Sequence, residues 1–141
     1  MATTTASVSI SSSDLTPGTS LNINASTTCM KAGLTTGLEK MEMGKNILTT
    51  ASGSTSLKLA TAAGADGAGK VYLCNNATDD TFYIRLDLHD TIVGRLYAGD
   101  WLFLPWSQVA TTNELVIQAF GGSCPYEYAI FKEDETIVAG S

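Results

Sequence analysis

Residues 64–70 are the first segment whose residue types could do chemistry. Their sequence, Gly-Ala-Asp-Gly-Ala-Gly-Lys, fits most of the phosphate-loop pattern, in which glycine amides cradle phosphates and a lysine contacts them. Such a loop needs a hydroxyl residue next, and then a helix whose N-terminus faces the phosphates. Val71 follows instead, and residues 71–74 are typical of a strand. We therefore expect residues 64–70 to be a flexible turn that binds no nucleotide.

The single histidine, His89, lies in an acidic stretch. On a strand, Asp87 and His89 would share a face, as two metal ligands must, and Asp79, Asp80 and Asp90 lie nearby in the sequence. No second histidine completes a ligand set, and no nucleophile signature such as Gly-x-Ser-x-Gly occurs. The simpler interpretation is a solvated strand end, with a turn starting at Asp79 and Asp80. We predict no catalytic residue, no metal site, no cofactor and no enzymatic activity.

Residues 94–106, Gly-Arg-Leu-Tyr-Ala-Gly-Asp-Trp-Leu-Phe-Leu-Pro-Trp, are the most distinctive segment. Gly99 and Asp100, followed by Pro105, superficially resemble the second motif of the cupins. Cupins then supply a histidine ligand, and residues 107–113 contain none. A metal-dependent cupin enzyme is therefore not expected, and the segment predicts only a strand–turn–strand unit.

The apolar run at residues 101–104 is expected to be a strand buried on both faces, because both of its sides are apolar. A tight turn at residues 98–100 should precede it, and Pro105 should end it. Trp101, Phe103 and Leu104 are then predicted to form the heaviest patch of the core, with the tryptophans as core and rim aromatics rather than a ligand platform.

Period-two alternation predicts further strands. It is clearest at residues 82–88, where Phe82, Ile84, Leu86 and Leu88 alternate with polar or amphipathic neighbours. Residues 115–120 and 126–131 supply two more strands. Turn signals recur at the spacing of a sandwich or barrel. We predict an all-β fold, a jelly-roll-like sandwich or barrel of about eight to ten short strands. Only Leu34, Leu38 and Met41 fit one short turn of helix.

The N-terminal region is rich in serine and threonine. Residues 7–13 and 20–26 each alternate small polar with apolar side chains, which indicates a hairpin, and Pro17 with Gly18 marks its turn. The alternative for residues 1–13 is a partly disordered arm. Residues 1–13 are too poor in apolar groups to anchor themselves in their own core. We therefore expect two parts: an extended N-terminal arm at 1–13 and a single β-domain at 14–141.

Composition and charge exclude several classes of function. Only 16% of the 141 residues are charged and the net charge is −6, with ten acidic residues against three basic ones after residue 70. Nucleic acid is therefore not expected as a partner, because phosphates need a basic face. No apolar run reaches the 18 or so residues of a membrane span, and no secretory signal is visible. Cys29, Cys74 and Cys124 are expected to be free, packed thiols, as in a protein folded in a reducing cytosol.

Three short patterns together resemble the small virion structural proteins of marine tailed bacteriophages, the cyanophages especially. They are the serine-rich residues 7–15, Lys70-Val71-Tyr72-Leu73 with Asn75-Asn76, and residues 94–100 leading to Pro105-Trp106. Their order and spacing span residues 7–131. The segment Met41-Glu42-Met43-Gly44-Lys45 departs from the simpler threonine-rich stretch of such proteins. The resemblance implies a particle component present in many copies, with no catalytic residues to carry over.

The leading hypothesis is a capsid decoration or accessory protein that binds the outer shell, including the major capsid protein, and is assembled in the host cytoplasm. We expect a homo-oligomer, a trimer, in which the arm makes contacts between subunits or with the shell. The first alternative is a tail, neck or fibre-associated virion protein that contacts the host surface. The second is a carbohydrate-binding or cupin-like module outside phages.

Overall fold

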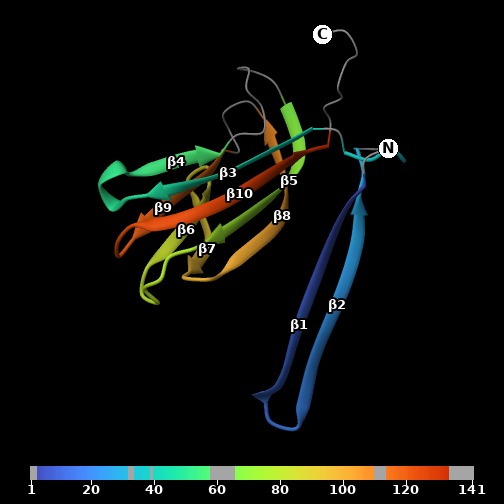
Figure 1. Ribbon diagram of the computed structural model, residues 1–141, viewed down its shortest axis with the longest axis horizontal. Coiled ribbons are helices and arrows are strands. Elements are labelled where there is room, and N and C mark those ends of the chain that lie inside the picture. Colours follow the sequence, from blue (N-terminus) through green and yellow to red (C-terminus); the bar gives the residue numbers. More distant parts are fainter. Residues whose placement is uncertain (1–2, 32–33, 39, 58–65, 110–113, 134–141) are drawn as a thin grey trace.

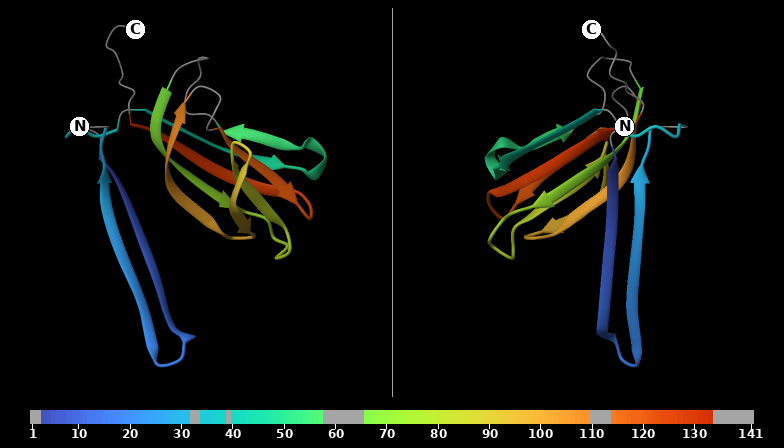
Figure 2. Two further views of the ribbon diagram at one scale, coloured as in Figure 1. Left: turned by 180° about the vertical axis from the view of Figure 1, so that it is seen from behind. Right: turned by 45° about the vertical axis from the view of Figure 1, so that its right-hand side comes forward.

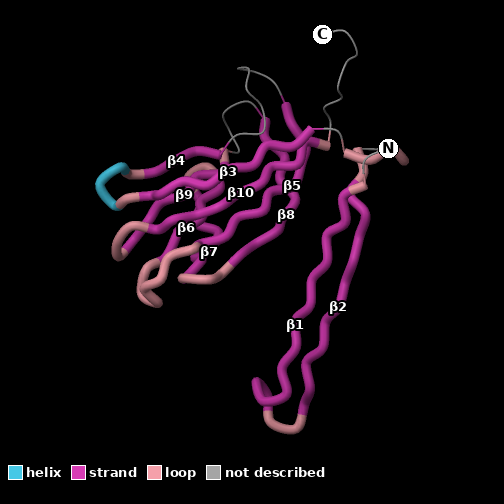
Figure 3. Tube along the Cα trace, in the orientation of Figure 1, coloured by secondary structure: helices cyan, strands magenta, loops and turns pink. Residues whose placement is uncertain are grey.

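The protein is all-β, as predicted. The structure is a computed structural model that describes residues 3–31, 34–38, 40–57, 66–109 and 114–133. It contains ten strands and one short 3-10 helix, η1 (Figures 1 and 3). Their bounds are β1 Thr4–Thr16, β2 Thr19–Cys29, β3 Lys40–Leu48, η1 Thr50–Ser52, β4 Ser54–Leu57, β5 Asp66–Asn75, β6 Tyr83–Leu88, β7 Thr91–Tyr97, β8 Trp101–Val109, β9 Leu115–Phe120 and β10 Cys124–Lys132.

Eight of the strands form two four-stranded antiparallel sheets that pack together (Figure 1). The first sheet has the order β3-β10-β5-β8 and the second has the order β4-β9-β6-β7. The chain alternates between the two sheets along most of its length, and only β6 and β7 are consecutive strands of one sheet. Most connections therefore cross between layers, which ties the two sheets together as a sandwich.

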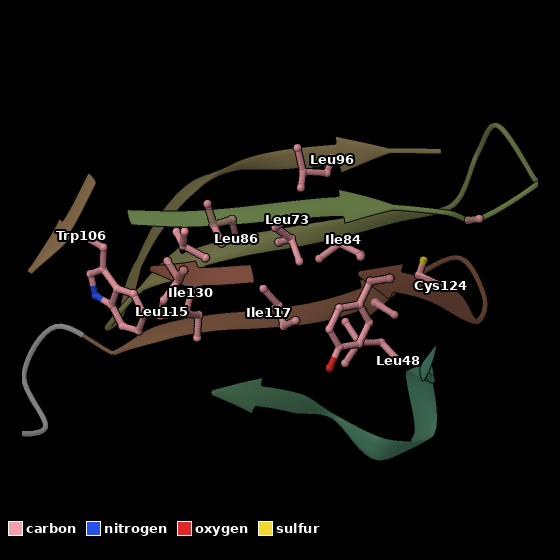
Figure 4. Close-up of a cluster of buried hydrophobic side chains, with 14 residues drawn as sticks. Leu48, Leu73, Ile84, Leu86, Leu96, Trp106, Leu115, Ile117, Cys124 and Ile130 are labelled. Atoms are coloured by element: carbon pink, nitrogen blue, oxygen red, sulfur yellow. The ribbon is translucent and has the colours of Figure 1, made fainter. Parts of the chain in front are cut away.

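The core lies between the inner faces of the two sheets (Figure 4). Alternation of buried and partly exposed residues marks β9 throughout and β6 as far as Asp87, and β6 is the strand predicted most clearly from the sequence. Ile84 on β6 and Ile117 on β9 are fully buried, and Val71 and Leu73 on β5 meet them from the other sheet. The remaining buried members of the cluster are Leu48, Ala77, Leu86, Leu96, Trp106, Leu115, Ala119, Cys124, Tyr126 and Ile130.

The prediction for residues 101–104 is wrong in two respects. Trp101 is 50% exposed, whereas Trp106 is the buried tryptophan at 5%. Residues alternate along β8, so Leu102, Leu104 and Trp106 face the core while Trp101 and Phe103 lie on the outer face. Pro105 does not end the strand, because β8 is an edge strand, where a missing backbone donor is tolerated.

Two smaller predictions also need correction. Residues 66–70 are not a turn but the start of β5, where they pair with residues 105–109 of β8; residues 64–65 lie outside the described residues. The predicted helical turn is absent from residues 34–38, which include a bend and an isolated bridge, and Met41 belongs to β3. Closely spaced glycines predict a turn only weakly, and three apolar residues at helical spacing predict a helix only weakly. In both segments, hydrogen bonding to a neighbouring strand decides the structure instead.

The predicted N-terminal hairpin is confirmed. β1 and β2 pair antiparallel, with Ser7 opposite Ser26 and Ile10 opposite Ile23. Pro17 and Gly18 form the turn between them, and Gly18 takes the positive φ of 78° that a glycine adopts without strain. The hairpin forms its own two-stranded sheet, projecting from the sandwich and diverging from it toward the tip (Figures 1 and 2). The division into an arm at 1–13 and a domain at 14–141 stays a prediction.

Asn75 is a fully buried polar residue that ties the two sheets together at one end. Its side-chain nitrogen donates to the Leu96 carbonyl oxygen of β7 at 2.8 Å, and its side-chain oxygen accepts from the Ala77 amide at 3.0 Å. Its backbone amide donates to the Asp100 carbonyl, and its carbonyl accepts from the Gly99 amide. The predicted tight turn at residues 98–100, where Gly99 has a φ of 86°, is thereby anchored to β5.

Replacing the buried tryptophan should destabilise the sandwich far more than replacing the exposed one. Trp106→Ala removes a core side chain and is expected to lower the free energy of unfolding by about 3–5 kcal/mol. Trp101→Ala is the matched control and should cost less than about 1 kcal/mol in the monomer. Urea unfolding at low protein concentration measures both. Equal losses in the two variants would contradict the orientation of β8.

Asn75→Leu should also destabilise the protein, by about 2–4 kcal/mol, because it leaves the Leu96 carbonyl and the Ala77 amide buried without partners. The neighbouring Asn76 is exposed, so Asn76→Leu serves as the control and should change the free energy of unfolding by about 0.5 kcal/mol or less. Thermal and urea unfolding report the difference. An Asn75→Leu protein as stable as the control would show that these hydrogen bonds contribute little.

Candidate interaction surfaces

The acidic stretch around His89 is not assembled as a site. β6 ends at Leu88, and His89 follows it in a left-handed turn conformation with a φ of 54°, beside Asp90. Asp87 instead pairs with Arg85, with 2.8 Å between Oδ2 and Nη2. Across the described ranges of the chain, no group of three or more histidine, cysteine or acidic side chains is placed to hold a metal ion.

The other polar and thiol groups named by the sequence have local roles. Asp79 starts a turn, as predicted: its carboxylate accepts hydrogen bonds from the Thr81 hydroxyl and amide, and these hold the pKa of Asp79 below its usual value. Cys29, Cys74 and Cys124 are free and buried, which confirms the prediction for the cysteines. Burial raises the pKa of the Cys124 thiol, which favours the unreactive protonated form.

The hairpin has one apolar and one polar face. Residues directly opposite each other in an antiparallel pair point to the same side, so the register separates the two sets. The first side, here called the apolar hairpin face, carries Ala6, Val8, Ile10, Leu21, Ile23 and Ala25, and Thr4, Ser12, Thr27 and Cys29 lie on the same side. The opposite face holds only serine, threonine and asparagine: Thr5, Ser7, Ser9, Ser11, Asn22, Asn24, Ser26 and Thr28.

The outer face of the first sheet is also apolar. Alternation on β5, β8 and β10 brings four aromatic side chains to this side, here called the aromatic face: Tyr72, Trp101, Phe103 and Phe131. Phe103 and Phe131 meet edge to face, with 6.3 Å between ring centroids. On β3, Met41, Met43 and Ile47 continue the same side and are each more than half exposed. Adjoining exposed apolar side chains of this kind make the face a candidate interaction surface.

The two apolar surfaces meet at the base of the hairpin. A cleft of about 610 Å³ lies between them, lined on one side by Ala6, Val8 and Ala25 and on the other by the four residues of the aromatic face. Tyr72 Oη donates to Glu127 Oε1 at 3.2 Å at this face. Partial burial, together with its neighbours Cys74 and Glu127, raises the pKa of Tyr72 to about 12, so its hydroxyl stays neutral at physiological pH.

The second sheet has a different outer face, which carries both arginines of the chain. Arg85 and Arg95 lie directly opposite each other on β6 and β7, a pairing that like charges normally disfavour. Arg85 lies over the Phe120 ring at 5.1 Å and Arg95 lies over the Tyr83 ring at 4.7 Å, measured to the ring centroids. Arg95 also donates to the Tyr97 hydroxyl, which raises the pKa of Arg95. These contacts offset the repulsion and leave an aromatic surface with an exposed guanidinium.

Comparisons with known proteins assign this chain to no family. Neither the scan against protein-family models nor the search of curated proteins found a match. In the described part of the chain, no helix has the length and apolar character needed to cross a membrane.

Sequence reasoning found both strands of the hairpin but missed that their apolar sides have little cover within the chain. A signal was present, because Val8, Ile10, Leu21 and Ile23 alternate in phase while the other side contains no apolar residue. The aromatic face was not predicted, and two of its members, Trp101 and Phe103, were assigned to the core. Its residues come from three strands far apart in the sequence, so only the sheet order brings them together.

Proposed function

We propose that this protein is a non-enzymatic structural component of a virion, a capsid decoration protein that binds the outer shell through protein–protein contacts. It assembles as a homotrimer and uses the hairpin for contacts between subunits or with the shell. The observation that carries the proposal is the projecting hairpin, whose apolar face continues beyond the cleft to the exposed residues Ile10 and Ile23. An isolated two-stranded sheet is at best marginally stable in water, so this element calls for a partner.

The strand order of the sandwich supports a jelly roll. Four strands in the order β3-β10-β5-β8 face four in the order β4-β9-β6-β7, and the chain crosses between them in the manner of two interlocked Greek keys. Jelly rolls are frequent in viral capsid and lectin domains. A fold of this kind is compatible with many functions, so it supports the proposal without carrying it.

The resemblance to small virion proteins of marine phages supports the same assignment. Its three patterns fall on β1, on β5 and on the β7–β8 unit. Asn75, which belongs to the second pattern, is the buried asparagine that anchors the turn in the third. The second and third patterns therefore coincide with positions that hold the sandwich together, and the first lies on the projecting hairpin.

A second candidate function is carbohydrate binding, and the outer face of the second sheet favours it. Tyr83 stacks on Phe120 with 5.1 Å between ring centroids, and Tyr97 and Arg95 are exposed beside them. Aromatic rings beside a guanidinium can contact the apolar and hydroxyl sides of a sugar. Attachment to a tail, neck or fibre would use the same surface against the host.

Copy number per particle separates these roles. Quantitative mass spectrometry of purified virions should find the protein in hundreds of copies, and labelled protein should appear over the whole head in electron micrographs. Tens of copies at the neck or tail would replace the decoration role with the tail alternative. Absence from virions, together with binding on a glycan array, would favour the carbohydrate-binding module.

Removing the hairpin should abolish particle binding while leaving the sandwich folded. Deletion of residues 2–28 leaves Cys29, which is buried, and all eight sandwich strands in place. We expect the shortened protein to keep a cooperative unfolding transition, since the core cluster contains no hairpin residue. Its occupancy on particles that lack the protein should fall at least tenfold in a co-sedimentation assay. Full occupancy without the hairpin would remove its proposed role.

A further inference from the structure

We propose that the outer half of the apolar hairpin face of one copy packs on the aromatic face of a second copy, so that neighbouring copies exchange hairpins. The inference rests on the homomeric assembly proposed above but not on its place in a virion. It assigns both halves of an interface: Ile10, Leu21 and Ile23 as the inserted side, and the aromatic face with Met41, Met43 and Ile47 as the receiving side.

Both halves are incompletely covered within one chain. Ile10 and Ile23 are 47% and 45% exposed, although they are the largest apolar pair of the hairpin. Trp101 is half exposed on the receiving side. The cleft at the hairpin base includes Val8 and Ala25 but does not reach Ile10 or Ile23. The hairpin diverges from its own sandwich toward the tip, which carries these residues away from the chain's own aromatic face (Figures 1 and 2).

The dimensions of the hairpin suit an exchange. At about 3.3 Å per residue, the 13 residues of β1 extend over about 40 Å, longer than the nine-residue strands of the sandwich at about 30 Å. A hairpin of this length can contact its own sheet at the base and a neighbouring sheet near the tip. Exchange of an identical element between copies is a low-cost route to symmetric association, best known in dimers.

The charge distribution is compatible with a second copy as the occupant. The chain carries a net charge of −6, so copies repel one another unless their contact surfaces are neutral. Between residues 4 and 29 the only charged side chain is Asp14, next to the turn. On the outer face of the receiving sheet, Glu127 pairs with Lys45, and Lys70 pairs with Glu133. Both surfaces are therefore nearly free of net charge.

The sequence of β8 has the pattern that such an exchange predicts. A run that is apolar on successive residues, as at 101–104, is typical of a strand covered on both faces. Within one chain the core covers the side of Leu102 and Leu104, while Trp101 stays half exposed. A partner's hairpin on the outer face supplies the second cover.

Two complementary variants test the pairing by sedimentation equilibrium of purified full-length protein. The hairpin variant, Ile10→Glu with Ile23→Glu, places charges on the inserted side. The face variant, Trp101→Glu with Phe103→Glu, places them on the receiving side. The control, Ser9→Glu with Asn24→Glu, adds the same two charges to the adjacent pair on the polar side of the hairpin.

The wild type should assemble, and each of the two interface variants alone should associate at least about tenfold more weakly, which corresponds to about 1.4 kcal/mol. The control should stay within about threefold of the wild type. A mixture of the hairpin variant and the face variant should regain association, because one intact hairpin then meets one intact aromatic face. Near-UV circular dichroism of the buried Trp106 checks folding, and Trp101→Ser replaces the face variant if that variant unfolds.

The possible results distinguish the hairpin exchange from the homomeric assembly on which it rests. A wild-type protein that stays monomeric at millimolar concentration overturns both the homomeric assembly and the exchange, and leaves the cleft to the chain's own hairpin or to another protein. An assembly that both variants leave intact, or a mixture that regains no association, overturns the exchange alone. Particle binding is measured separately and bears only on the virion role.

Discussion

A two-stranded sheet gains too little from its own hydrogen bonds to remain folded in water, and residues 4–29 form such a sheet. The central strands of the sandwich have their inner sides against the opposite sheet, where Ile84, Ile117 and Leu73 are fully buried. The hairpin has no such layer over its outer half. The apolar face of β1 and β2 therefore requires a second apolar layer to pack against. The cleft at the hairpin base and the aromatic face beside it are the apolar surfaces that could form that layer.

Amphipathic strands inside the sandwich were predictable from the sequence because one of their sides is buried. On β6 the burial follows the alternation seen in the sequence as far as Leu86, and β9 alternates between buried and partly exposed residues throughout. Pro17-Gly18 was predictable for a similar local reason, since the turn needs a positive φ that glycine supplies. Sequence patterns predict the structure reliably where residues close together in the sequence determine it.

The errors arise where non-local pairing overrides a local signal. Pro105 normally ends a strand, but it lies on the edge strand β8, and that position follows only from the order of the sheet. Residues 66–70 have the composition of a turn and become strand through pairing with β8. Trp101 and Trp106 look equivalent in the sequence, and only the register of β8 against β5 places one outside and the other in the core.

The candidate surfaces were less predictable than the fold. Within the described residues, the three sequence patterns that could do chemistry have structural roles: the glycine-rich segment forms a strand in its described part, Asp87 is paired with Arg85, and the Gly99–Asp100 turn is anchored by Asn75. The surfaces that stand out instead are made by side chains from several strands. Their chemistry is apolar contact and aromatic stacking.

Amide hydrogen exchange measured at low and high protein concentration tests the central claim most directly, because it reports the protection of each strand separately. The sandwich strands should be protected at both concentrations. The amides of β1 and β2 should exchange rapidly in the dilute monomer and become protected as the protein assembles, together with a loss of solvent access at Trp101. A hairpin that is already strongly protected in the monomer, or that stays unprotected in the assembly, would contradict the claim that another copy covers it.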